Sequence, residues 1–301
     1  MSRENSNKST VTIEVAVNQA LDEIEELFKT KVAVRGLTTG FKDLDGILSG
    51  LQNADLIVIG ARPSMGKTCF IMNIVEHIGI VKKKPVAIFS LERSAVKVAF
   101  TMLASQSKIN GVKLRLGALA NDDWPKLSDA LLRIRDSPIV IDDTPGLTVY
   151  EIISRAKSLH RDYADGFSVI IIDYMQLIQP SDKNASRNES ISVITRSLKL
   201  LARELNIPVI VTSQLKRSLE SRDNKRPRMS DLKWGGSIEQ DADVILFIYR
   251  DEVYNESSDQ NGMAEITIAK QRNGPIGKVR LVFSGEFTRF ENYSAAHSYN
   301  E

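Results

Sequence analysis

Residues 61–68, with the sequence ARPSMGKT, form the loop whose residue types best suit the binding of a polyphosphate. The loop follows the apolar run LIVIG and precedes a stretch with helical character, Cys69 to Ile78. Backbone N–H groups and a helix start attract phosphate oxygens there, Lys67 neutralises the β and γ oxygens, and the Thr68 hydroxyl holds Mg²⁺. Ala61 replaces the first glycine of the usual pattern, and because alanine is also small we expect the turn to be kept.

Polar residues at the ends of three apolar runs are the other candidates for chemistry, because ligands of open parallel sheets bind beyond the carboxyl ends of the strands. Asp173 closes the run VIIID, where a carboxylate can orient the ligands of Mg²⁺. Glu92 follows VAIFSL, where a carboxylate can polarise an attacking water. Gln214 follows PVIVTS and is placed to sense the γ-phosphate by hydrogen bonding.

Asp142 and Asp143 compete with Asp173 as the magnesium-coupled carboxylate, because the run IVI before them also ends in acidic residues. Hydrophobic periodicity does not separate these candidates. The sequence from Asp143 to Gly146, Asp-Thr-Pro-Gly, is typical of a turn, so we favour Asp173. For Glu92 the alternative is an ordinary surface glutamate.

Short apolar runs that alternate with helical stretches after Gly40 must position these residues. The runs are nearly continuous in apolar residues, as expected for strands covered on both faces: 56–60, 86–90, 139–143, 169–173, 208–213 and 244–249. One apolar helical face spans Glu189 to Leu205, and the alternation predicts an α/β domain with a parallel, doubly wound sheet. Glu265 to Phe283 predicts a β-hairpin at the sheet edge, because EITIAK and KVRLVF flank RNGPIG.

The composition describes a globular chain with little overall charge bias. Of 301 residues, 42% are hydrophobic, and the formal net charge is +2. That charge is too small to indicate nucleic-acid binding by itself, so such a role depends on where the basic residues lie. The single cysteine, Cys69, excludes an internal disulfide and fits a reducing compartment. The polar start MSRENSNKST and the strand-sized apolar runs predict a soluble, cytoplasmic protein without a membrane span.

The chain before the sheet carries an amphipathic helix. Apolar residues from Val11 to Phe28 recur at steps of three and four, which places them on one helical face. The pattern leaves open whether this face packs on its own domain or on a neighbouring subunit. We therefore expect a polar tail with a linker helix over residues 1–34, one ATPase-type domain over 35–290, and a polar tail over 291–301.

An ordered set of motifs resembles the RecA-like motor domain of bacterial and phage replicative helicases of the DnaB type. The resemblance runs from Arg35 to Pro275, which is most of the chain, and the set is highly specific. It comprises RGLTTGFKDLD, SGLQ, ARPSMGKT, FSLE, IDDTPGLT, IIIDYMQLI, LKLLARELNIPVI, SQLKRSLE, KRPRMSDL, GSIEQDAD, YRDE and KQRNGP.

This resemblance implies a role for each matching residue in binding and hydrolysing ATP with Mg²⁺. Glu92 matches the catalytic glutamate, Asp173 the magnesium-coupled aspartate and Gln214 the sensor, and the nucleotide-binding loop is matched by Ser64, Gly66, Lys67 and Thr68. The strand end that reaches the adjacent subunit's ATP site is matched by Lys270, Gln271 and Arg272, with Arg272 as arginine finger. A cation supplied by a neighbour stabilises the phosphoryl transition state only in the assembled ring. In isolation these last residues would fit a solvated hairpin edge.

The resemblance also implies a homo-oligomer, a hexameric ring that moves 5′ to 3′ along single-stranded DNA during DNA replication. The helix from Val11 to Phe28 is similar to the family's linker helix, which packs on a neighbouring motor domain. Full-length members carry an N-terminal collar that binds primase, for which this chain has no room, and a helicase loader is a further possible partner. Two rival functions stay open: a recombinase-type DNA-binding ATPase that forms filaments, and a regulatory module that binds ATP without translocating.

DNA binding is expected in loops beyond the sensor strand. Residues 216–233 contain seven basic and three acidic residues, which predicts a basic surface loop facing the ring channel. The family's DNA contacts match Lys233, Trp234 and Gly236, although the family usually has Arg-Glu-Ser-Gly where this chain has Lys-Trp-Gly-Gly. Lysine lacks the guanidinium fork, and the tryptophan either stacks on a base or, as we favour, packs on its own domain.

Two further positions complete the expectations. A second loop, 181–190, offers Lys183 or Arg187 to DNA, although ordinary surface residues are the better interpretation. Thr101 stands where the family commonly has an arginine near the nucleotide, which puts the details of phosphate contact in doubt.

Overall fold

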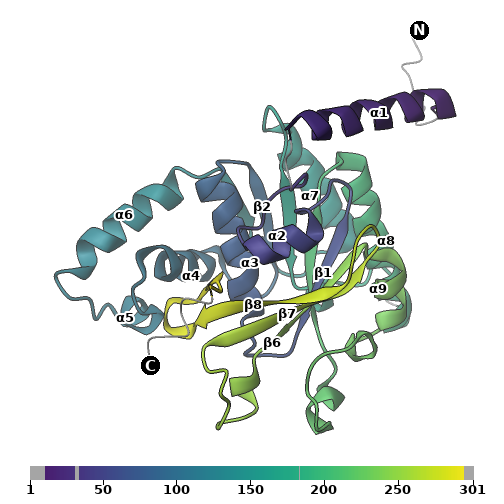
Figure 1. Cartoon of the computed structure of the whole chain (residues 1–301). Helices are drawn as coiled ribbons and strands as arrows, with labels where there is room; N and C mark the ends of the chain where they lie inside the picture. Colours follow the sequence, from purple (N-terminus) through teal and green to yellow (C-terminus); the bar gives the residue numbers. More distant parts are fainter. Residues whose placement is uncertain (1–10, 31–33, 183, 295–301) are drawn as a thin grey trace.

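A computed structural model describes residues 11–30, 34–182 and 184–294. Its parallel strands coincide with the six apolar runs: β1 (Leu56–Ala61), β2 (Val86–Ser90), β3 (Ile139–Asp142), β4 (Val169–Asp173), β5 (Val209–Gln214) and β6 (Val244–Tyr249). They lie side by side in the order β3-β2-β4-β5-β1-β6 (Figure 1). The predicted mostly parallel, doubly wound α/β sheet is therefore confirmed.

Three antiparallel strands extend the sheet beyond β6: β7 (Met263–Gln271), β8 (Gly277–Ser284) and β9 (Arg289–Asn292). The hairpin of β7 and β8 was expected. The strand β9 was not, and it means that the polar tail expected from residue 291 begins later, because Asn292 still pairs with Leu281. Residues 295–301 of that tail lie outside the described part of the chain.

Helices cover both faces of the sheet. One face carries α2 (Lys42–Leu48), α3 (Lys67–Glu76), which continues as a π-helical turn, and α4 (Ala95–Ser107); the other carries α7 (Val149–Arg161), α8 (Arg187–Leu205) and α9 (Gly235–Asp241). Successive strand residues point to opposite faces, so Ile57 and Ile59 pack with the first group and Leu56 and Val58 with the second.

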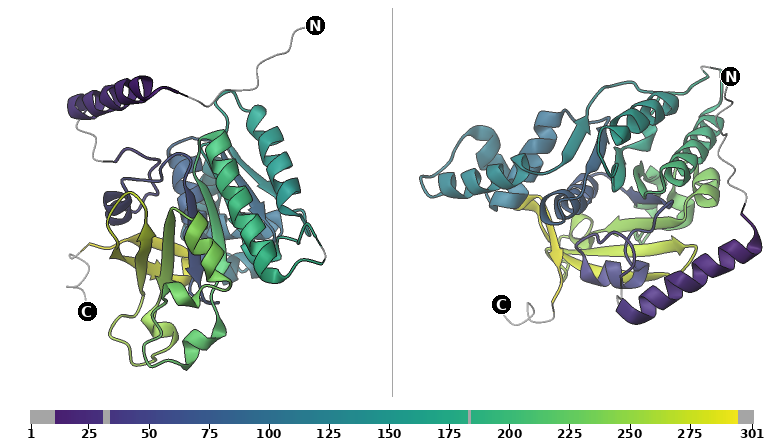
Figure 2. Two further views of the ribbon diagram at one scale, coloured as in Figure 1. Left: turned by 90° about the vertical axis from the view of Figure 1, so that its right-hand side faces the viewer. Right: turned by 90° about the horizontal axis from the view of Figure 1, so that it is seen from above.

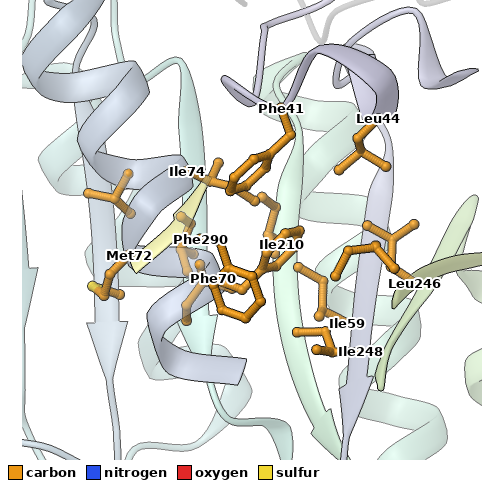
Figure 3. Close-up of a cluster of buried hydrophobic side chains, with 14 of the residues drawn as sticks. Phe41, Leu44, Ile59, Phe70, Met72, Ile74, Ile210, Leu246, Ile248 and Phe290 are labelled. Atoms are coloured by element: carbon orange, nitrogen blue, oxygen red, sulfur yellow. The ribbon is translucent and has the colours of Figure 1, made fainter. Parts of the chain in front are cut away.

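The first of these two cores is closed by aromatic side chains. Phe70 of α3 stacks on Phe41, with ring centroids 5.0 Å apart, and meets Phe290 of β9 edge-on at 5.5 Å (Figure 3). The Phe290 backbone N–H donates to Asn73 Oδ1 at 2.7 Å. Packing on α3 thus accounts for β9, a strand too short and polar to be predicted from its own sequence.

Two helical regions stand apart from the sheet. Helices α5 (Gly111–Leu116) and α6 (Asp123–Arg135) project with α4 from the β3 side, and α1 (Ile13–Thr30) lies away from the domain body (Figures 1 and 2). The apolar stripe of α1 is exposed, with Ile13 at 80% and Phe28 at 83%. Of the two alternatives for this helix, packing on its own domain is not seen for the side chains of α1 that the structure describes. Residues 1–10 and 31–33 of the expected N-terminal segment lie outside the described ranges.

Within the described ranges, the structure contains no helix with the length and apolar character that crossing a membrane requires.

Candidate functional site

The loop between β1 and α3 has the shape of a phosphate cradle. Gly66 adopts φ of 89°, and a Cβ added there would lie 2.9 Å from the Phe290 ring, so glycine is required on two grounds. Ser64 is also left-handed, with φ of 67°, while Met65 between them is buried as an anchor. Helix α3 begins at Lys67, which directs its first N–H groups toward the loop.

A buried carboxylate faces the start of α3. Asp173, the last residue of β4, accepts a hydrogen bond from the Thr68 hydroxyl at 2.9 Å, and its other oxygen lies 3.4 Å from Lys67 Nζ. Thr212 of β5 donates to the same carboxylate at 2.5 Å. A hydroxyl and a carboxylate oxygen at this spacing are the ligands that Mg²⁺ prefers, and the ammonium beside them can neutralise phosphate charge.

Tyr174 completes the wall of this site. Lys67 Nζ lies 4.3 Å from the centroid of the Tyr174 ring, a cation–π contact that orients the lysine side chain. Burial raises the pKa of the Tyr174 hydroxyl, and the negative charges of Glu92 and Asp173 raise it further. The Tyr174 hydroxyl therefore stays protonated at neutral pH.

The competing aspartates are committed elsewhere. Asp142 forms an ion pair with Arg155 at 3.0 Å and accepts from the Thr144 N–H, which makes the predicted turn. Asp143 accepts from the Ala95 N–H at 2.7 Å. The structure thus brings Asp173, and neither of the other two, to the phosphate loop.

Glu92 and Gln214 lie at the same edge of the sheet as Asp173. Ser90, two residues before Glu92, is in register with Asp173, and Gln214 is in register with Ala61 of the loop. Glu92 is exposed beside a cavity of about 420 Å³ that Thr101 also lines, together with Arg93 and Arg115.

The backbone around Gln214 is held by a side chain that the sequence did not single out. The Gln214 N–H donates to Gln176 Oε1 at 3.1 Å, and Gln176 Nε2 donates to Ser213 Oγ at 2.9 Å. Gln176 stands three residues after Asp173, so it connects the carboxylate and sensor strands. Its position in the motif YMQLI was visible in the sequence, but the pairing of β4 with β5 was not.

Lys270, Gln271 and Arg272 lie at the opposite edge of the sheet. Because β7 runs antiparallel to β6, its end pairs with the beginning of β6, where Gln271 faces Val244. Strand β1, with a rise of about 3.3 Å per residue, separates the two edges by roughly 17 Å. Arg272 therefore points away from the phosphate loop of its own chain.

The residues matched to DNA contacts surround a cavity of about 700 Å³ lined by Asn188, Lys216, Lys233, Trp234, Gly235, Gly236 and Ser237. Trp234 is half-buried against the core beneath α9, and the guanidinium of Arg187 lies 5.5 Å from the centroid of its ring. Of the two alternatives for this tryptophan, the structure thus has packing on its own domain. Lys183 falls outside the described part of the chain.

The expected basic surface loop is only partly free, which corrects the expectation drawn from residues 216–233. Arg222 pairs with Asp231 at 2.8 Å, and Arg226 forms a bidentate ion pair with Glu265. The Arg217 side chain, by contrast, is 91% exposed. The loop is held by these ion pairs, and two of its lysines, Lys216 and Lys233, line the cavity at Trp234.

Residues 36–292 match the family described as DnaB-like helicase C terminal domain. The chain belongs to this family. The resemblance carried by the ordered motifs is therefore confirmed, and with it the RecA-like class of the fold.

Several DnaB proteins are similar to the chain. Over 92% of its length it is 50% identical to "Replicative DNA helicase DnaB" of Buchnera aphidicola subsp. Acyrthosiphon pisum (strain APS), of which it covers 62%. The protein of the same name from Pasteurella multocida (strain Pm70) is 48% identical over 96% of the chain, which covers 63% of it. The chain thus spans about six-tenths of the length of these relatives.

Two solved structures share the fold at 36% identity. "ATPase Domain of G40P" aligns with a TM-score of 0.91 over 95% of this chain and all of that one. "The Structure Of A DnaB-Like Replicative Helicase And Its Interactions With Primase" aligns with a TM-score of 0.88 over 96% of this chain and 69% of that one. The chain therefore corresponds to an ATPase domain in extent and shape.

Proposed function

We propose that this chain is the motor of an ATP-dependent replicative DNA helicase, which hydrolyses ATP at the interfaces of a homo-hexameric ring and moves 5′ to 3′ on single-stranded DNA. The observation that carries the proposal is the contact of Thr68 and Lys67 with the buried carboxylate of Asp173, beside a loop shaped for phosphates. Family membership and the names of the relatives support the same conclusion.

The residues present fit ATP and Mg²⁺. The Thr68 hydroxyl and Asp173 would hold the ion, Lys67 and the N–H groups of residues 64–68 would hold the phosphates, and bound Mg²⁺ supplies charge neutralisation during phosphoryl transfer. Glu92, at the rim of this edge, would polarise the attacking water. Gln214 would sense the γ-phosphate through the strand end that Gln176 holds.

The separation of Arg272 from the loop of its own chain supports a site divided between subunits. Arg272 at the opposite edge reaches a nucleotide only when a second copy of the chain presents its phosphate loop there. A head-to-tail ring has this geometry. The exposed stripe of α1 supports the same assembly, since an apolar helix face of this length is stable when another subunit covers it. Gln271 and Lys270 would join Arg272 at this shared site.

Single-stranded DNA would lie along Lys233, Trp234 and Gly236. Lys216 and Arg217, next to the cavity there, offer phosphate contacts without base recognition. Trp234 would act chiefly through its packing, since its ring already lies against the domain and Arg187. We further propose a primase partner, because one of the solved relatives is described by its interactions with primase. A helicase loader and a cytoplasmic setting are part of the same proposal, since the family resemblance implies a replicative motor.

ATP turnover with and without single-stranded DNA tests the proposal. We expect wild-type turnover that DNA stimulates, unwinding of a forked duplex, and a loss of turnover of about 10²-fold or more in Lys67→Ala, because the phosphate charge is no longer neutralised. Lys82→Ala, an exposed lysine at the far end of the same helical segment, is the matched control and should behave as wild type.

Native mass spectrometry with and without nucleotide measures assembly, for which we expect a hexamer. An ATPase that DNA does not stimulate and that leaves the forked duplex intact would contradict the motor function and favour the non-translocating module. Strand exchange by an open filament would favour the recombinase-type ATPase.

A further inference from the structure

Helix α9 carries two functional regions at its two ends. Its first residues, Gly235 and Gly236, follow Lys233 and Trp234 at the cavity proposed to contact DNA. Its last turn lies beside Lys270 and Arg272, the residues proposed to reach a neighbour's nucleotide. Seven residues therefore connect the two sites, a length of about 10 Å at a rise of about 1.5 Å per residue.

The contacts at the last turn are made by carbonyl groups that the helix leaves free. Lys270 Nζ donates to the carbonyls of Glu239 and Ala242, the latter at 2.6 Å, and Arg272 donates to the Gln240 carbonyl. Cations at this end of a helix are favoured, because its last carbonyls lack partners and carry partial negative charge. The position of both cations is thus set by the backbone of α9.

Asp243, two residues after α9, also holds Arg272 in place. Its Oδ1 lies 3.3 Å from Arg272 Nε, its backbone carbonyl accepts from the Arg272 N–H at 3.0 Å, and its Oδ2 accepts from Lys199 and from the Leu56 N–H. The pairing register of β6 and β7 shifts just before Lys270, a bulge of the kind that re-aims side chains. The end of β7 therefore stays paired with β6 while its cationic side chains contact the last turn of α9.

Helix α9 is too short to be rigid alone, because two turns of helix are marginal in water. It is braced by α8, where the Thr195 hydroxyl donates to Asp241 Oδ2 at 2.5 Å and Ser192 contacts Ser237. Thr195 is fully buried, so its hydroxyl is a specific link and not a solvated surface contact. This bracing keeps the last turn ordered while its first turn faces the cavity.

We propose that α9 couples DNA contact in one subunit to ATP hydrolysis in the next, by positioning Arg272 and Lys270 through the carbonyls of its last turn. The inference rests on the proposed function and adds a route by which DNA stimulates turnover. DNA bound at Lys233 and Trp234 displaces the first turn, and the braced helix moves the finger cations with it. Thr195 and Asp243 are positioning residues in this route, and neither lies at the phosphate loop or at the DNA cavity.

Thr195→Val tests the route, because it removes the hydroxyl that holds Asp241 and keeps the shape of the side chain. We expect basal ATPase and affinity for single-stranded DNA to match wild type, while the ratio of DNA-stimulated to basal kcat falls by about fivefold or more. Thr195→Ser, which restores a hydroxyl, should recover the ratio. A purely structural defect would lower basal and stimulated rates together and would not distinguish the two variants.

Asp243→Asn tests the other contact with Arg272. We expect the stimulated kcat to fall by about fivefold or more, with KM for ATP within about twofold of wild type, because the finger is misplaced while the phosphate loop is intact. Glu265→Gln is the matched control. Glu265 has a carboxylate of similar burial that pairs with Arg226, and it lies near the start of β7, whereas Arg272 follows the end of that strand. The stimulation ratio of Glu265→Gln should equal that of wild type.

Two results would overturn the inference, and they differ in meaning. If DNA stimulates wild type and both Thr195→Val and Asp243→Asn keep the full ratio, the coupling route is wrong and the motor function stands. If DNA does not stimulate wild-type turnover, the proposed function and the inference fail together.

Discussion

The parallel sheet has a carboxyl edge, where its strands end, and an amino edge, where they begin. These two edges hold charged side chains in different ways. At the carboxyl edge, Lys67 and Asp173 are 14% and 4% exposed, and side chains from two neighbouring elements fix the carboxylate. At the amino edge, the Arg272 side chain is 46% exposed, and its partners are the Gln240 carbonyl and the Asp243 carboxylate. The first arrangement is built to stay in place around a ligand, and the second can exchange its partners. This difference is what a site divided between a receiving and a donating subunit requires.

The amino edge also contains incompletely compensated negative charge. Burial, together with the neighbouring charge of Asp243, raises the pKa of Asp55 to about 6, and the positive charges of Lys199 and Arg272 lower it again. In the proposed ring, movement of Arg272 toward a neighbour would remove part of the positive charge that compensates these two carboxylates. That loss would favour the return of the proposed finger after each hydrolysis.

Removal of Arg272, which the donating subunit would supply, should have the largest effect on ATP turnover. In Arg272→Ala we expect ATP binding to remain and turnover to fall by about 10³-fold or more, because the transition-state charge is no longer stabilised in trans. A fluorescent ATP analogue measures binding, and single-turnover hydrolysis measures chemistry. Unchanged turnover would contradict the finger assignment.

Mixing variants sharpens the comparison of the two edges. In rings made from equal amounts of Lys67→Ala and Arg272→Ala subunits, about one interface in four joins an intact loop to an intact finger, since a head-to-tail interface takes one half from each copy. ATPase should reappear on mixing, although each variant alone is inactive. If both halves of the site belonged to one chain, the mixture would stay inactive.

A second pair of variants separates the two acidic strand ends that the sequence left in competition. Asp173→Asn should lower kcat by about 10²-fold or more and weaken the dependence on Mg²⁺, because the ion loses a carboxylate that orients its ligands. Asp142→Asn, the matched control, should change kcat by less than about threefold, since Asp142 pairs with Arg155 and does not contact the phosphate loop. Steady-state ATPase over a Mg²⁺ titration measures both, and equal losses would contradict the assignment.

That competition shows how far a local pattern predicts the site. The strands were predictable because each is a continuous apolar run, which two covered faces demand. Asp142 and Asp173 both end such runs, and only the order β3-β2-β4-β5-β1 decides which one lies near the loop. Strand order depends on tertiary packing, and a local pattern does not contain it. The turn pattern from Asp143 to Gly146 favoured Asp173, and the family motifs supported the choice that periodicity could not make.

The same limit applies to the residues that the sequence did not single out. Thr212 and Gln176 gain their roles from the neighbours that β4 and β5 provide, and Asp243 from the antiparallel return of β7. The strand β9 was missed because Phe290 is its single buried residue. The basic loop was overestimated because the acidic partners of its arginines lie partly outside it, as Glu265 does.

The smallest predicted effect concerns stability and comes from a second buried acid. Helix α3 begins with Lys67 at the carboxyl edge and runs back to Glu76, which is 3% exposed. Burial raises the pKa of Glu76 to about 7 from 4.5, although hydrogen bonds from Ser105, Gln106 and Asn73 and the charge of Arg289 lower it. One of its carboxylate oxygens, Oε1, has no hydrogen-bond partner.

The pH dependence follows from this direction of shift. Below about pH 4.5 the group is protonated in both the folded and the unfolded chain, so it costs nothing. Between about pH 4.5 and 7 the unfolded chain loses the proton first, and above pH 7 the full cost of burying the charge applies, at most about 3 kcal/mol. Glu76→Gln removes this cost, so we expect its Tm to exceed that of wild type at pH 8 by a margin that shrinks toward pH 5.

Glu291→Gln provides a control of opposite sign on the neighbouring strand β9. Burial alone would raise the pKa of Glu291, but Arg289 and Lys108 lower it below its usual value, so this carboxylate stabilises the fold at high pH. Its removal should lower Tm slightly at pH 8, and that loss should persist down to pH 5, because this stabilisation is lost only as the pH falls below about 4.5. Thermal unfolding from pH 5 to 8 measures both variants. A constant margin for Glu76→Gln would mean that its effect comes from packing and not from the buried charge.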